Sequence, residues 1–186
     1  MDLYTPRLHL RCLEKTDLPA LSTLCADPMV MRYFPKPLND QESEAFASKI
    51  RTLYQKQGWG ICAVEKRDNG EFIGIVGLIQ STGQGFPLGH PFVEMTWRIR
   101  SEYWRQGFAF EAASACLDYG FTQLNLDALY AFTAKINGPS ICVMEKLKMH
   151  NTHLDFDHPR LDPTSPLLRH CLYRLRFEEW QSKQPK

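Results

Sequence analysis

The 186-residue sequence predicts a mixed α/β (α+β) fold, in which a mostly antiparallel central sheet of about seven strands carries helices on both faces. Several segments alternate apolar and polar residues with a period of two, as half-buried strands do. Others repeat apolar residues at helical spacing. Three of the expected strands follow one another without a crossover helix, which excludes a doubly wound dinucleotide-binding fold.

The N-terminal part of the chain is expected to form a strand and two helices. Residues 7–13 alternate and predict the strand. Asp17 is a candidate cap for a short helix ending near Cys25. A second helix is expected from Asn39 or Asp40 to the glycines at 58 and 60, with Trp59 opening the next strand. The apolar positions of this second helix are Ala45, Phe46, Ile50, Leu53 and Tyr54.

A hairpin and a second series of elements are expected next. The segments 59–67 and 71–80 flank Asp68-Asn69-Gly70, and Asn-Gly favours a tight turn because both residues tolerate positive φ. The remaining expected elements are a loop at 81–91, a strand at 93–99, a helix at 106–120, a strand at 127–134, a helix capped by Asn137, a strand near 152–156 and a strand at 169–177.

Composition narrows the class of protein. Lys plus Arg number 22 and Asp plus Glu 21, a balance that argues against non-specific nucleic-acid binding. The sequence contains no run of 18 apolar residues, so no membrane span is predicted. The start of the chain lacks a secretory signal pattern. The six cysteines form no CxxC pair. We therefore expect one cytoplasmic domain over 1–186, with reduced thiols and no metal, nucleic-acid or membrane partner.

The segment Tyr103–Ala112 is the strongest chemical signal in the chain. It lies between an expected strand and an expected helix and contains Gly107. A glycine turn at the start of a helix directs several main-chain N–H groups at one point, which suits a phosphate or pyrophosphate. The segment lacks the P-loop and GxGxxG patterns, so an ordinary strand-to-helix turn remains an alternative on spacing alone.

Five pieces of the sequence, in order, resemble the GNAT acetyltransferase superfamily and its branch of ribosomal-protein N-terminal (RimJ/RimL-like) acetyltransferases. They are Thr5–Arg11, Val93–Ile99, Tyr103–Ala112, Asn137–Leu147, and Asp157–Arg160 leading to His170–Leu175. Two positions depart from the usual family pattern. Trp104 replaces a Gln or Arg, and Lys148 replaces a glycine after the fourth motif. We expect the second departure to alter a helix end locally.

The resemblance implies acetyl-coenzyme A as co-substrate and assigns residues to it. Main-chain N–H groups of the turn would hold the pyrophosphate, and the strand near Trp97 would pair with the pantetheine amides. Arg105 could also reach a phosphate. The implied cofactor-binding residues are Trp97, Arg98, Ile99, Trp104, Arg105, Gln106, Gly107, Phe108, Ala109, Asn137 and Ser140.

The implied reaction is direct attack of a primary amine, on a peptide or a small molecule, on the thioester. Glu94 is the leading candidate for the base that accepts the amine proton. Tyr173 is the candidate acid for the departing thiolate, with Ser140 as its rival. Candidate acceptor-lining residues are Trp59, Phe86 and His158. The alternative is an inactive acyl-coenzyme A-binding sensor or adaptor. The sequence leaves open both the acceptor and the choice of monomer or homodimer.

Overall fold

A computed structural model describes residues 1–182, and its contacts divide the chain into two compact units. The first unit comprises Met1–Leu78 and Thr96–Cys116, and the second comprises Ile79–Met95 and the chain from Leu117 onward. Each unit is described by itself below. The expectation of a single domain stays a prediction.

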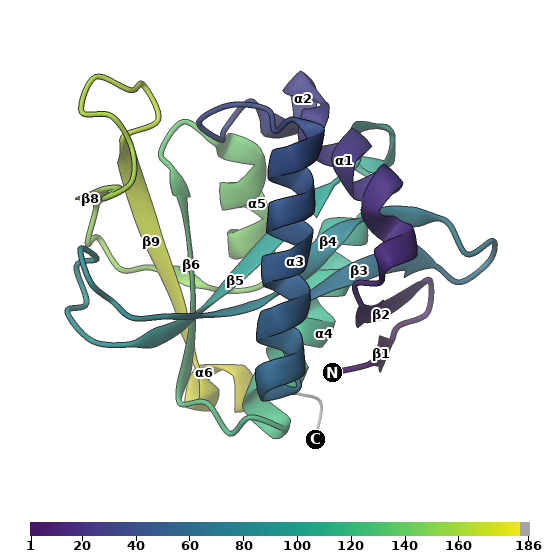
Figure 1. The fold of residues 1–186 in the computed structure, drawn as a ribbon. Helices are drawn as coiled ribbons and strands as arrows, with labels where there is room; N and C mark the ends of the chain where they lie inside the picture. The colour runs from purple at the N-terminus through teal and green to yellow at the C-terminus, as the bar shows by residue number, and fades with distance from the viewer. Residues whose placement is uncertain (183–186) are drawn as a thin grey trace. The chain divides into compact units, whose positions relative to one another are not determined.

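The strands form one mixed sheet. In the described part of the chain, hydrogen-bonded neighbours follow the order β1-β2-β3-β4-β5-β6-β9-β7, and β8 also pairs with β9. Figure 1 labels these strands except β7. The β5–β6 pair is parallel, whereas β2–β3, β3–β4 and β6–β9 are antiparallel. The predicted mixed, mostly antiparallel sheet is thus confirmed.

The first unit contains an antiparallel meander. Its strands are β1 (Leu3–Tyr4), β2 (Leu8–Cys12), β3 (Ile61–Lys66) and the greater part of β4 (Phe72–Ser81). The predicted hairpin joins β3 to β4, with Gly70 at φ +71°. Every residue of β4 from Phe72 to Leu78 is buried, as its apolar run predicts.

Three α-helices also belong to this unit: α1 (Leu18–Ala26), α2 (Pro28–Met31) and α3 (Asp40–Gln57). The predicted start and end of α3 are confirmed. Asn39 caps the helix, since its Oδ1 accepts the Glu42 N–H at 2.8 Å, and Gly58 ends the helix at φ +79°. The predicted inner face is partly wrong. Ala45 and Leu53 are exposed, and the buried positions are Ser43, Ala47 and Ile50.

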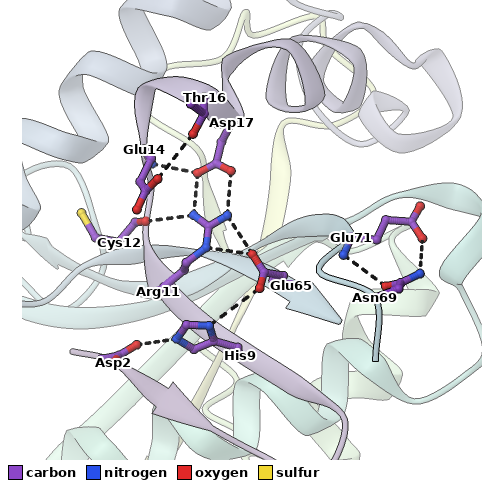
Figure 2. Close-up of polar contacts among 10 residues, drawn as sticks. All are labelled: Asp2, His9, Arg11, Cys12, Glu14, Thr16, Asp17, Glu65, Asn69 and Glu71. Atoms are coloured by element: carbon purple, nitrogen blue, oxygen red, sulfur yellow. Dashed lines mark hydrogen bonds and ion pairs between the residues drawn. The ribbon is translucent and has the colours of Figure 1, made fainter. Parts of the chain in front are cut away.

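Asp17 does not cap α1, which corrects the sequence prediction. Its carboxylate instead accepts bonds from both terminal nitrogens of Arg11, at 2.7 and 2.9 Å, and from the Glu14 N–H at 2.8 Å (Figure 2). Arg11 also contacts Glu65 on the adjacent strand, at 2.9 Å. The nearby, partly buried guanidinium of Arg11 attracts this carboxylate more strongly than the helix amides do.

The second unit is built around β6 (Ala128–Ala134) and β9 (Arg169–Arg176), which pair along their whole lengths. Two short strands, β7 (His150–Asn151) and β8 (Phe156–Asp157), occur where a single strand was expected. The remaining elements are the first residues of β5 (Phe92–Ile99), the end of α4 (Phe108–Thr122), α5 (Gly138–Lys146) and α6 (Phe177–Gln181).

Candidate active site

In the first unit, the predicted phosphate-binding turn is shaped by side-chain bonds to main-chain carbonyls. The indole nitrogen of Trp104 donates to Ile99 O at 2.7 Å, and Gln106 Nε2 donates to Glu102 O at 2.9 Å. Arg105 and Gly107 both have positive φ, +61° and +83°. The left-handed conformation is strained for an arginine, so the turn keeps this geometry because its neighbours hold it.

The turn presents a row of main-chain donors. Helix α4 begins at Phe108, two residues later than predicted, so residues 105–107 form an exposed turn before it. Within residues 1–182, the N–H groups of residues 105–110 donate to no backbone or side-chain acceptor. Free N–H groups at a helix N-terminus, together with the helix dipole, suit a pyrophosphate. The residues present therefore fit the implied cofactor.

Arg7 braces this turn from the N-terminal segment. Its Nη1 donates to Gln106 O at 3.0 Å, its Nε contacts Glu111 Oε2 at 2.6 Å, and its guanidinium carbon lies 4.2 Å from the centre of the Phe108 ring. Glu111 also accepts the Thr5 hydroxyl at 2.6 Å. The Thr5–Arg11 motif can be seen in the sequence, but the contacts of Arg7 cannot, because Gln106 and Glu111 lie about a hundred residues further along the chain.

In the second unit, Glu94 lies in a desolvated position on β5. Glu94 pairs with Tyr130 on β6, and this is the one register pair between β5 and β6 in the described chain. Tyr130 pairs in turn with Arg174 on β9. Burial raises the pKa of Glu94 to about 7, although the positive charge of Arg160 acts in the opposite direction. A carboxylate with this pKa can accept and release a proton near neutral pH.

A cluster of rings explains the desolvation on this face. Phe92 contacts Tyr130 at 5.4 Å between centroids, and Phe86 lies 5.5 Å from Phe92 and 5.9 Å from His158. The structure thus brings together two of the three predicted acceptor-lining residues. Burial lowers the pKa of His158 to about 4, so its imidazole is neutral at pH 7. Trp59 belongs to the first unit, and its lining role stays a prediction.

Tyr173, the candidate acid, lies on the opposite face of the sheet from Glu94. Tyr173 pairs with Ala131, one position along from the Tyr130–Arg174 pair, so its side chain alternates away from that of Glu94. Burial raises the pKa of Tyr173, and a hydrogen bond from Asn151 partly offsets the rise. The phenol therefore keeps its proton at neutral pH.

Asn137 holds the first turn of α5, as predicted. Its Oδ1 accepts the Ser140 N–H at 3.3 Å, while its Nδ2 donates to Thr133 Oγ1 at 2.8 Å and to Ser140 Oγ at 3.0 Å. Both amide protons of this side chain are therefore used. The geometry makes Asn137 a residue that positions Ser140, and its contact with the pantetheine stays a prediction.

Among the described residues, no group of three or more His, Cys, Asp or Glu side chains could hold a metal ion. No helix in this part of the chain is long and apolar enough to cross a membrane.

The mixed sheet and its helices define an acetyltransferase-type fold. A family model described as an acetyltransferase (GNAT) domain matches residues 7–150. The chain belongs to the GNAT acetyltransferase family, and it is an N-acetyltransferase. It is 36% identical over 145 residues to the spermidine N(1)-acetyltransferase of Escherichia coli K12, an alignment that covers 75% of this chain and 71% of that protein.

Solved structures agree on the fold. A GNAT acetyltransferase from Bacillus anthracis matches with a TM-score of 0.81 at 24% identity, covering 96% of this chain and all (100%) of that one. RimL, a ribosomal L7/L12 α-N-protein acetyltransferase in complex with coenzyme A, matches with a TM-score of 0.78 at 11% identity, covering 96% of this chain and 99% of that one. The predicted GNAT fold is confirmed.

Proposed function

We propose that this protein transfers the acetyl group of acetyl-coenzyme A to a primary amine, by direct attack of the amine while both substrates are bound. The observation that carries the proposal is the row of N–H groups at 105–110 without protein acceptors, beside a glycine turn at the start of α4. When bound, acetyl-coenzyme A supplies an activated acetyl group as a thioester.

Glu94 acts as the base in this proposal. An amine must lose its proton to attack, and a free amine is mostly protonated at pH 7. Glu94, with a pKa of about 7, is ionised in a substantial fraction of molecules at that pH and accepts the proton directly or through a water. The nearby apolar rings raise the proton affinity of the Glu94 carboxylate, because they exclude water that would otherwise stabilise its charge.

Two hydroxyl groups compete for the role of acid. Tyr173 keeps its proton at neutral pH, but its hydroxyl is already bonded to Asn151. Ser140 lies at the start of α5, where Asn137 fixes it through two bonds. We assign the proton or hydrogen bond for the departing sulfur to Ser140 and keep Tyr173 as the second choice. Replacing Ser140 with Ala should lower kcat more than replacing Tyr173 with Phe.

The acceptor is a peptide N-terminus or a small-molecule amine. Among the relatives, one is named for spermidine and another for a ribosomal protein, so both kinds of amine occur in related proteins. Phe86 and His158 supply an apolar wall for it, and the neutral imidazole does not repel an ammonium group.

An amine panel tests the proposal. The purified protein is incubated with acetyl-coenzyme A and with Ser- and Ala-starting peptides, spermidine and aminoglycosides, and the released thiol and the acetylated product are both measured. We expect turnover with at least one amine. Binding of acetyl-coenzyme A without any turnover would instead indicate the sensor or adaptor, and failure to bind would overturn the cofactor assignment as well.

A further inference from the structure

Arg98 has an unusual environment within the first unit. Its side chain leaves β5 and runs among residues of α1, of the α2–α3 loop and of α3. Nη1 lies 3.0 Å from the sulfur of Cys25, and the guanidinium carbon lies 4.1 Å from the ring centre of Phe34 and 5.4 Å from that of Phe46. Stacking on aromatic rings satisfies the faces of the guanidinium but not the N–H groups at its edge.

The positive charge of Arg98 has no carboxylate partner in residues 1–182. Its Nε is buried there without a hydrogen-bond acceptor. Burial raises the pKa of the Cys25 thiol, so the sulfur is neutral and does not compensate the charge. Two other arginines of the same unit differ from Arg98 because each has carboxylate partners. Arg11 binds Asp17 and Glu65, and Arg100 binds Glu71 and Glu102.

An uncompensated cation in this position is costly, since desolvating a charge without a partner opposes folding. Burial accordingly lowers the pKa of Arg98, yet a guanidinium stays protonated at neutral pH. Arg98, Phe34 and Phe46 are all only partly exposed. A bound anion would supply the missing partner.

We propose that Arg98 recognises a carboxylate on the acceptor, so that the preferred amine is an amino acid or an acidic peptide and not a polyamine. This inference rests on the proposed function. The other anion at hand is a phosphate of the cofactor, but main-chain donors already serve that group at the turn before α4. The side chain of Arg98 contacts Cys25, Phe34 and Phe46, none of which is among the implied cofactor-binding residues, whereas the strand at Arg98 is assigned to the pantetheine through its main chain.

Matched pairs of amines test this inference. Each pair differs in one charge, such as glycine against glycinamide, or Ala-Asp against Ala-Asn peptides with amidated C-termini, and spermidine is included. For the wild type we expect kcat/KM to favour the carboxylate member of a pair by about 10- to 100-fold, the effect of one charged hydrogen-bonded contact. Arg98→Gln should abolish the preference between the two members of each pair.

Two control variants make the result specific. Arg98→Lys keeps the charge and should retain part of the preference. Arg100→Gln removes a cation that already has two acidic partners, so the preference should persist. A preference for spermidine, or an unchanged ratio in Arg98→Gln, would overturn the inference. A rise in KM for acetyl-coenzyme A with no change in the ratio would assign Arg98 to a cofactor phosphate and also overturn it.

A second measurement does not depend on turnover or on the stability of a variant. The Nε–H signal of Arg98 in wild-type protein is followed by NMR, after assignment by its absence from Arg98→Lys. We expect N-acetylglycine or N-acetylaspartate to shift this signal and their amides to leave it in place. If neither carboxylate moves it, the inference fails. This readout is independent of the proposed reaction, whose failure would appear only in the amine panel.

Discussion

Glu94 is the residue whose protonation should control the rate. Because its folded pKa is about 7, kcat/KM should rise as the pH increases through about 7, where the carboxylate becomes able to accept a proton. Glu94→Gln should lower kcat by about 100-fold, the lower end of what general-base catalysis supplies. Its remaining activity should rise only at higher pH, as the amine itself loses its proton.

Arg160→Gln provides the matched control for this profile. The charge of Arg160 lowers the pKa of Glu94, so its removal should move the acidic limb of the profile to higher pH while Glu94 still serves as base. A profile that is identical in the wild type and in Glu94→Gln would exclude the base role.

Lys148 carries backbone strain at the position where the GNAT family usually has glycine. It follows α5 with φ +62°, in the left-handed region where glycine has no side-chain penalty. Lys148→Gly should therefore raise the free energy of unfolding by about 1 kcal/mol. Urea denaturation measures the change, and Lys146→Gly, inside the last turn of α5, should be destabilising instead. A destabilised Lys148→Gly would show that the strain argument is wrong.

Among the elements, the N-terminal segment is linked to the start of α4 by the contacts of Arg7 with the Glu111 carboxylate. Arg7→Gln should loosen the turn at Gln106 and raise KM for acetyl-coenzyme A about tenfold, equivalent to about 1.4 kcal/mol. The kinetics with acetyl-pantetheine, which lacks the pyrophosphate, should stay unchanged. Equal losses with both donors would indicate a general structural defect.

The bridge between β2 and the segment before α1 predicts a stability change with pH. Burial raises the pKa of Asp17, but the bonds from Arg11 and Glu14 outweigh it, so the pKa lies below its usual range. The stabilisation is therefore present above the unfolded pKa of about 3.9 and is lost as the pH falls through the folded value. Asp17→Asn should cost about 2 kcal/mol at pH 7 and progressively less below pH 4.

The matched control for the bridge is Asp68→Asn. This residue forms an exposed pair with Lys66 at 3.2 Å, and exposed pairs contribute about 0.5 kcal/mol or less. Urea midpoints at pH 7 and pH 3.5 compare the two variants. If Asp17→Asn lost as much stability at pH 3.5 as at pH 7, the bridge would not account for the stabilisation.

For the whole molecule, local patterns were sufficient to predict most elements. The alternation in residues 93–99, the Asn39 cap and the Asn-Gly turn are signals within a few residues of one another, and each gave the correct element. The short elements β1, α2 and α6 were missed, because segments of two to five residues show too little periodicity.

Features that depend on distant contacts were less predictable. The partner of Asp17 and the inner face of α3 are decided by packing against other segments, which overrides local preference. The candidate turn and Glu94 were found from the sequence, but the brace by Arg7 and the unpaired charge of Arg98 were not. Both depend on which residues meet in three dimensions.

Calorimetric titration of the folded protein with acetyl-coenzyme A tests the central claim most directly, since the account depends on a pyrophosphate bound by the N–H groups of residues 105–110. We predict saturable heat with one site per chain, and weaker binding for acetyl-pantetheine and for Gly107→Val, whose branched side chain opposes the φ of +83°. Absence of heat, or equal affinity for the donor without the pyrophosphate, would contradict it.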